Sequence, residues 1–306
     1  MKTDWWQTTF PQGQQTLTID DARNRSVRLA YGEKGRGRPM ILVHGLGSWS
    51  YSWRHNLDTL AQEFRTICFD AKGYGFSEKP TWDDVAGHQV VELERFIRTV
   101  CEPPAIVVAE SLGALAALAL AQRAPELFER LVLLNVPIFP KDLPSWGMQL
   151  LAGVPLELIR QIDRARWMQP LGPLFRQIVS VTREEVVVDA SEVDEEDIYW
   201  LCYPYIEFPG AIAKFVEEVQ LALAEIQQLQ RGAPSLIRSI QSGLAMMEIP
   251  TLVLWGDRDR WFPVADGKTL HRQLPNASLQ VIPNCGHKPT ASSAATINTA
   301  ILSFAG

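Results

Sequence analysis

The sequence has no apolar run of about 18 residues, the length that a membrane-spanning helix requires, so no transmembrane segment is predicted. Residues 1–15 have no apolar core behind a positively charged start, so we expect no signal peptide. The four cysteines form no close pair and no Cys-x-x-Cys motif, which indicates buried free thiols in a reducing compartment. These absences favour a cytoplasmic protein.

Basic charge and phosphate-binding loops are also missing. The net charge is −6, so a nucleic-acid partner is not expected. Neither Gly-x-x-x-x-Gly-Lys-Ser/Thr nor Gly-x-Gly-x-x-Gly occurs, so the glycine-rich turns are not nucleotide-binding loops. We expect no cofactor and no metal, and we find no sequence signal for the oligomeric state.

The chain does contain short apolar runs that alternate with segments of helical periodicity. Strands are predicted at 16–20, 26–31, 40–43, 66–70, 106–110, 131–135, 251–255 and 278–282, and helices at 52–63, 84–100, 114–121, 264–274 and 291–304. The first two strands read as a hairpin. The alternation that follows predicts an α/β fold with a doubly wound, mostly parallel sheet.

The alternation is interrupted after residue 137. From 138 to 247 the chain reads as mostly helical, with many prolines and only one short valine run, at 186–188. We therefore expect an α/β core made of residues 1–137 and 248–306, and a helical cap made of residues 138–247. The acidic cluster between Glu192 and Asp197 is interpreted as a solvated helix start.

A nucleophile elbow is predicted around Ser111. An apolar β-run ends at this serine, and an alanine- and leucine-rich helix follows it at once. Such a turn holds the serine in a strained conformation with its hydroxyl above the sheet. The small residues Ala109 and Gly113 allow strand and helix to pass in contact, although Ala109 stands where the usual pattern has glycine.

A base and an acid for this serine are expected downstream, each after its own strand. The carboxyl ends of parallel strands share one edge of the sheet, where ligands bind. His287 is the only one of the five histidines in a loop after a downstream strand, so we predict it as the base. Asp259 is preferred as the acid, with Asp257 as the alternative that caps the turn. Asn135 is a neutral residue at the preceding strand end.

Stabilisation of an oxyanion requires two backbone N–H groups. We expect one from Leu112, at the start of the helix after the serine, and the other from Leu46, in the His44-Gly45-Leu46-Gly47 turn. Asp70 is interpreted as an acceptor that fixes a turn. Two roles are open for Glu110: a partner beneath the elbow, or an electrostatic influence on the histidine.

These pieces resemble the α/β-hydrolase superfamily. The matching motifs are His44-Gly45-Leu46-Gly47 with 51–54, Asp70 to Pro80, Ala109-Glu110-Ser111-Leu112-Gly113, Leu254 to Asp259 and Ile282 to His287. The resemblance implies eight strands, a helical lid between the sixth and seventh strands, and a cofactor-free serine hydrolase. Relatives that act on epoxides or halogenated compounds use an aspartate nucleophile, and Ser111 argues against both activities.

The predicted function is cleavage of an ester, or of a related acyl or carbon–carbon bond, in a hydrophobic small molecule. Ser111 would attack, His287 would carry the proton and Asp259 would orient the histidine. Aromatic residues and methionines of the cap should roof an apolar pocket; the aromatic residues are Trp146, Trp167, Trp200, Phe175 and Phe208. The alternatives are a receptor-like ligand-binding protein, or a lyase or peroxidase, on the same fold with little ester turnover.

Overall fold

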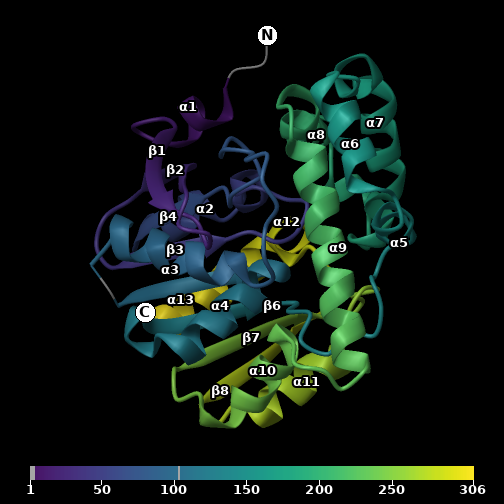
Figure 1. Cartoon of the computed structure of the whole chain (residues 1–306). Coiled ribbons are helices and arrows are strands. Elements are labelled where there is room, and N and C mark those ends of the chain that lie inside the picture. The colour runs from purple at the N-terminus through teal and green to yellow at the C-terminus, as the bar shows by residue number, and fades with distance from the viewer. Residues whose placement is uncertain (1–3, 103) are drawn as a thin grey trace.

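The computed structural model describes residues 4–102 and 104–306, and its centre is one eight-stranded sheet (Figure 1). The strands are β1 (Gln15–Asp20), β2 (Ser26–Lys34), β3 (Pro39–Val43), β4 (Arg65–Phe69), β5 (Ala105–Glu110), β6 (Phe128–Leu134), β7 (Thr251–Gly256) and β8 (Ala277–Ile282). Their spatial order is β1-β2-β4-β3-β5-β6-β7-β8. The pairs β1/β2 and β2/β4 are antiparallel and all other pairs are parallel, which confirms the predicted fold class.

Helices lie along the sheet and between its sixth and seventh strands. The α-helices are α1 (Trp5–Thr9), α2 (Leu57–Leu60), α3 (His88–Val100), α4 (Leu112–Arg123), α5 (Trp146–Ala152), α6 (Leu156–Arg164), α7 (Met168–Thr182), α8 (Glu195–Glu207), α9 (Ala211–Gln230), α10 (Leu236–Gly243), α11 (Val264–Gln273), α12 (Pro289–Ser292) and α13 (Ala294–Ala305). Short 3₁₀ turns are η1 (Ser50–Trp53), η2 (Pro125–Leu127), η3 (Arg183–Glu185), η4 (Ala190–Glu192) and η5 (Leu244–Met246).

The two faces of the sheet are covered by different helices because side chains alternate along each strand. On β3, Ile41 belongs to the core that contains α3, α4, α10 and α11, whereas Leu42 belongs to the core that contains α2 and α13. Every residue of β5 is buried. Strands covered on both faces explain why the sequence shows continuous apolar runs there.

One predicted helix is wrong. Residues 52–63 form the 3₁₀ turn η1 and the single turn α2 in place of a continuous helix. The apolar residues of this stretch are buried as expected, but polar anchors divide it. The Ser50 N–H and hydroxyl both donate to Asp70, and the Asn56 amide donates to Asn298. These long-range bonds outweigh local helix propensity.

The helix predicted from residue 84 begins at His88, after Gly87 in a left-handed conformation with φ of 72°. The segment before it is not helical, and within it the Asp84 carboxylate contacts Lys72 and Lys214. Neither lysine is a sequence neighbour of Asp84. The early start was predicted from local periodicity, which carries no information about such distant partners.

Helices α5 to α10 connect β6 to β7, and the valine run at 186–188 is not a strand. The acidic cluster does start a helix: Asp194 and Asp197 form a reciprocal capping box at the first turn of α8. It is not wholly solvated, however. The Asp197 carboxylate is buried and pairs with Arg54 at 2.6 Å and with the Tyr51 hydroxyl at 3.0 Å.

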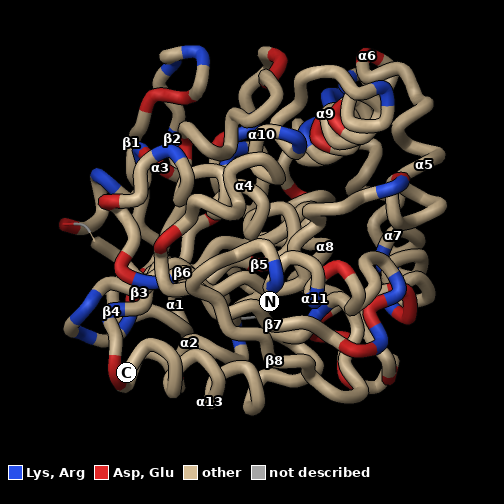
Figure 2. The backbone as a smooth tube through the Cα atoms, turned by 90° about the horizontal axis from the view of Figure 1, so that it is seen from below, with Lys and Arg blue, Asp and Glu red and all other residues tan. Residues whose placement is uncertain are grey.

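The N-terminal helix α1 packs onto the core. Trp5 and Trp6 are buried and make ring contacts with Phe10 and Trp49. All four cysteines are buried and free. Across residues 4–102 and 104–306, helices are too short or too polar to cross a bilayer. Figure 2 shows acidic and basic residues interspersed along the chain.

Candidate active site

Ser111 lies at a sharp turn between β5 and α4. Its backbone has φ of 53° and ψ of −123°, a strained conformation for a residue with a side chain. Its N–H donates to the Leu134 carbonyl of the neighbouring strand. At Gly113, an added Cβ would lie only 2.3 Å from the His44 carbonyl oxygen, so a glycine is required there. Ala109 is fully buried, and the elbow forms with alanine in that position.

The three residues predicted as nucleophile, base and acid meet at one edge of the sheet. His287 Nε2 lies 3.0 Å from Ser111 Oγ, and His287 Nδ1 lies 2.8 Å from Asp259 Oδ2. Ser111, His287 and the Asp259 side chain are all buried. The rings of Trp261 and Phe262 pack against the imidazole and fix its plane. The arrangement is a continuous relay from hydroxyl to carboxylate.

Asp259 and Asp257 have different partners. The second oxygen of Asp259 accepts the N–H groups of Trp261 and Phe262, so the carboxylate is held rigidly toward the histidine. Asp257 accepts the N–H of Cys285 at 3.2 Å and braces the loop that carries His287. This geometry corresponds to the predicted division of roles between the two residues.

Asn135 links three of the loops at this edge. Its amide accepts the Gly256 N–H and donates to the Gly286 carbonyl, each at 3.0 Å. Asn135 has φ of 45°, in the left-handed region that asparagine tolerates better than most residues. An amide can both donate and accept, which a carboxylate cannot do, so Asn135 ties the end of β7 to the His287 loop.

The glycine turn after β3 lies directly beside the serine. A Cβ added to Gly45 would lie 2.9 Å from Ser111 Cβ. His44 fixes this turn: its Nε2 accepts the Ala71 N–H at 2.9 Å, and its Nδ1 lies 2.9 Å from the Gly45 carbonyl. Burial lowers the pKa of His44 to about 4, so the imidazole is neutral and Nε2 accepts. Leu46 and Leu112, the predicted oxyanion donors, both line the cavity in front of Ser111.

Glu110 is a partner beneath the elbow, the first of the two roles considered for it. Its fully buried carboxylate accepts hydrogen bonds from the Lys288 ammonium and the Thr290 hydroxyl, each at 3.1 Å. Because Lys288 follows His287 directly, this pair joins the serine turn to the histidine loop. Two catalytic candidates on distant segments are thereby held in register.

Asp70 fixes a turn as expected. It accepts the N–H and hydroxyl of Ser50 and the N–H of Phe76, so it ties the loop after β4 to the turn η1. Burial raises the pKa of Asp70 to about 6, against these hydrogen bonds, which lower it. Asp70 is not among the residues that line the cavity at Ser111.

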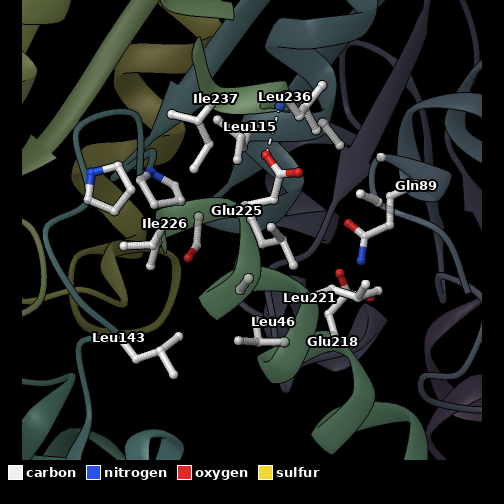
Figure 3. A pocket seen from close by; sticks show the side chains of 18 of the residues that line it. Leu46, Gln89, Leu115, Leu143, Glu218, Leu221, Glu225, Ile226, Leu236 and Ile237 are labelled. Atoms are coloured by element: carbon white, nitrogen blue, oxygen red, sulfur yellow. Dashed lines mark hydrogen bonds between the residues drawn. The ribbon is translucent and has the colours of Figure 1, made fainter. Parts of the chain in front are cut away.

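A mostly apolar cavity opens in front of Ser111 (Figure 3). Leu46, Leu143, Leu221, Ile226 and Ile237 surround it, and its polar residues include Gln89, Glu218 and Glu225. The face of α9 supplies Glu218, Leu221, Ala222, Glu225 and Ile226, a spacing of three and four residues that belongs to one side of a helix.

The cap aromatics predicted to roof this pocket do not line it. Trp146 and Trp167 are 64% and 60% exposed, whereas Trp200 is buried against Trp49 and Tyr51. Phe175 and Phe208 lie elsewhere in the helical region. The apolar character of the pocket was predicted correctly, and the cap residue Met148 lines it, but leucine and isoleucine, including those of α9 and α10, take the place of the cap aromatics.

A buried ionic network adjoins the cavity, and sequence reasoning missed it. His88 Nδ1 and Nε2 lie 3.1 Å from Glu92 and 2.9 Å from Glu218, so α3 and α9 are joined through one imidazole. Asp84, His88 and Glu92 have donor atoms close enough for a metal ion. However, the Lys72 ammonium lies 2.6 Å from Asp84 and 2.5 Å from Glu92, so lysine already fills that position.

We expect the stabilising effect of His88 to depend on pH. Burial opposes its charge, but Glu218 and Glu92 raise the pKa of His88 well above its ordinary value. The resulting stability is complete below about pH 6.5 and is lost as the pH rises through the folded-state pKa. The free energy of unfolding of the wild-type protein should therefore exceed that of the His88→Gln variant most at about pH 6, and the difference should shrink as the pH rises through the folded-state pKa of His88.

Urea unfolding of both proteins across this range measures the difference. His55→Gln is the matched control. His55 is largely exposed, and partial desolvation together with the nearby Arg54 lowers its pKa, so its effect should not shrink as the pH rises. A pH-independent effect of His88→Gln would contradict the assignment of a protonated imidazole.

Comparison with known proteins identifies the family. Residues 40–300 match the alpha/beta hydrolase family, so the chain belongs to it. A 2-hydroxy-6-oxo-6-phenylhexa-2,4-dienoate hydrolase of Burkholderia cepacia is 24% identical over 296 residues, with 94% of each chain covered. Epoxide hydrolase 1 of Caenorhabditis elegans is 36% identical over 281 residues, which are 86% of this chain and 64% of that protein. An alpha/beta hydrolase fold protein from Burkholderia ambifaria has the same fold, with a TM-score of 0.74, 22% identity, and 94% and 97% of the two chains covered.

Proposed function

We propose that this protein is a serine hydrolase that cleaves an ester, or a related acyl or carbon–carbon bond, in a hydrophobic small molecule. The observation that carries the proposal is the 3.0 Å contact between Ser111 Oγ and His287 Nε2 at the wall of an apolar cavity. His287 would take the serine proton as Oγ attacks a carbonyl carbon. Asp259 would hold the imidazole in the required tautomer and stabilise its cationic form.

The oxyanion formed in that attack needs donors at the opening of the cavity. We assign them to the backbone N–H groups of Leu46 and Leu112, since both residues border the cavity beside Ser111. The collapse of the tetrahedral intermediate would return the proton from His287 to the leaving group, and water would then release the acyl group. We also assign residues 138–247 as a cap domain, because α9 of this region forms much of the cavity wall.

The nucleophile distinguishes between the activities named among the relatives. Ring opening of an epoxide requires a carboxylate nucleophile in the relatives that carry it out. Ser111 occupies the elbow here, and Glu110 next to it is engaged with Lys288 and Thr290. Acyl chemistry therefore fits this site better than epoxide chemistry.

The charge of the cavity wall bears on whether the substrate is a neutral ester or a dienoic acid. The Burkholderia cepacia relative is named for a dienoate substrate. Lysine and arginine do not occur among the described residues that line the cavity, whereas Asp142, Glu218 and Glu225 do. The one basic side chain in the wall, His88, is already paired with Glu92 and Glu218. A substrate carboxylate would meet carboxylates without a free cation, so we propose a neutral substrate.

The proposal is tested by labelling the protein with a fluorophosphonate and mapping the adduct by mass spectrometry, together with turnover of short aryl esters. A single adduct on Ser111 and measurable turnover support a serine hydrolase. Absence of both refutes it. Labelling without turnover of any ester, thioester, lactone or dienoic diketone, accompanied by tight ligand binding, would favour the receptor-like alternative.

Substrate charge gives a separate prediction. The kcat/KM for a neutral aryl butyrate should exceed that for the matched aryl hemisuccinate by about tenfold or more, because Glu225 should repel the carboxylate of the hemisuccinate by about 1.4 kcal/mol or more. Glu225→Gln should reduce this ratio several-fold, because it removes the negative charge. The local structure should be kept, since the amide oxygen can still accept the Leu236 N–H that Glu225 accepts at 2.7 Å. The exposed Glu157→Gln is the control. Equal rates for both esters would argue against a neutral substrate.

A further inference from the structure

The cavity in front of Ser111 extends away from the serine along α4. Leu115 and Ala116 line it, so it continues for at least one turn of that helix, about 6 Å beyond Ser111. Helix α10 packs on α4, and its first two residues, Leu236 and Ile237, line the same part of the cavity (Figure 3). A bound acyl chain can therefore reach a region that is remote from the catalytic groups.

Gln89 is a polar side chain of this remote region. It lies in the first turn of α3 and is partly buried, and Figure 3 shows its amide directed into the cavity. Within residues 4–102 and 104–306 the amide makes no hydrogen bond. The neighbouring His88, in contrast, contacts Glu92 and Glu218 with its two ring nitrogens. The donor and the acceptor of Gln89 are thus free for a ligand.

Glu225 supplies a second polar group. Its partly buried carboxylate accepts the Leu236 N–H at 2.7 Å with one oxygen, which anchors it at the start of α10. The other oxygen accepts no hydrogen bond in the described part of the chain. The remaining carboxylates of the wall are placed differently, because Glu218 pairs with His88 and Asp142 is exposed to solvent. Glu225 is therefore the carboxylate best placed to accept a hydrogen bond from a bound molecule.

We propose that the substrate carries a neutral hydroxyl group remote from the bond that is cleaved, and that Gln89 and Glu225 bind this hydroxyl. A carboxylate can only accept, whereas an amide N–H needs an acceptor, and a hydroxyl group meets both demands at once. The wall around them is apolar, with Leu115, Leu221 and Ile237. The inference rests on the proposed hydrolase activity and names its substrate class: an acyl compound with a hydroxylated, otherwise apolar chain.

Other neutral chains fit these two residues less well. A hydrocarbon chain would displace water from Glu225 and Gln89 and leave their polar atoms without partners, which is the situation that lets a binding site discriminate against an analogue lacking a hydroxyl. An ether or a ketone could accept from the Gln89 amide but could not donate to Glu225. The combination of an acceptor with a donor therefore selects the alcohol.

Aryl esters of ω-hydroxyalkanoic acids test the proposal, compared with the unsubstituted and the ω-methoxy esters of the same chain length. Because Leu115 lies about 6 Å along α4 from Ser111, acyl chains of about six to ten carbons cover the expected position. At the best length, kcat/KM for the hydroxy ester should exceed that for both other esters by about tenfold. The Kd values measured with Ser111→Ala, which binds the esters without turnover, should show the same order.

Two variants change the proposed contacts. Gln89→Leu removes the amide at similar size, so the preference for the hydroxy ester should fall about threefold or more. In Glu225→Gln the amide oxygen can still accept the Leu236 N–H, and its NH₂ group then faces the cavity as a donor. The methoxy ester should therefore gain on the hydroxy ester. Gln228→Leu is the matched control, because Gln228 is exposed on α9, and it should leave the preference unchanged.

Equal kcat/KM and equal Kd for the three esters at every chain length would overturn the proposal. So would a wild-type preference retained in both Gln89→Leu and Glu225→Gln, or a preference for the ω-amino ester over the hydroxy ester. The result also separates this proposal from the hydrolase activity. Turnover without preference removes the hydroxyl site and keeps the hydrolase, whereas tighter binding of the hydroxy ester without turnover keeps the hydroxyl site and removes the hydrolase.

Discussion

Ser111→Ala should lower kcat/KM for an aryl ester by about 10³- to 10⁶-fold and abolish fluorophosphonate labelling. In the proposed mechanism the Ser111 hydroxyl forms the bond to the substrate, and His287 Nε2 lies 3.0 Å from it to receive its proton. The loss should fall on kcat, because an alanine leaves the apolar cavity wall intact. Steady-state kinetics and intact-mass spectrometry measure both effects.

Ser48→Ala is the matched control for this substitution. Ser48 is buried in the glycine turn near the site, and its hydroxyl has no partner in the described part of the chain. Its removal should change kcat/KM by less than about threefold, in keeping with a side chain that makes no hydrogen bond. If Ser111→Ala retained wild-type turnover with an unchanged unfolding midpoint, Ser111 would not be the nucleophile.

The core of the fold could be predicted because the sheet is buried on both faces. Six of the eight strands pair in parallel within a covered sheet, so β3, β5 and β7 appear as apolar runs that local reasoning detects. The relay residues were predictable for a related reason. Ser111, Asp259 and His287 each follow a strand, and parallel strands bring their carboxyl ends to one edge.

The helical region could be predicted only as helical. Its packing depends on contacts between distant residues, such as His88 with Glu218 and Asp84 with Lys214. These side chains resemble ordinary surface charges in the sequence, and only the structure shows that they are buried at the junction of α3 and α9. The same reason explains the misplaced aromatic residues: Trp146 and Trp167 face outward, whereas leucines of α9 meet the cavity.

The division of labour between the two aspartates after β7 also follows from distant contacts. Sequence spacing favoured Asp259 as the acid and Asp257 as the residue that caps the turn, but spacing alone does not show which carboxylate reaches the histidine. The structure distinguishes the two aspartates through partners 28 residues further along the chain: His287 for Asp259, and the Cys285 N–H for Asp257. One substitution in each residue therefore compares a group that contacts the base with a group that braces its loop.

Asp259→Asn should lower kcat by about 10⁴-fold, while Asp257→Asn should cost less than about tenfold. An amide at position 259 no longer stabilises the imidazolium, and it can present an N–H to His287 Nδ1, which favours the tautomer that keeps its proton on Nε2. At position 257 the amide oxygen can still accept the Cys285 N–H, so the loop keeps its shape. In both variants Ser111 should remain accessible to the fluorophosphonate. The rate of labelling should fall strongly in Asp259→Asn and stay near the wild-type rate in Asp257→Asn. Equal losses in the two variants would mean that Asp259 acts on the loop and not on the histidine.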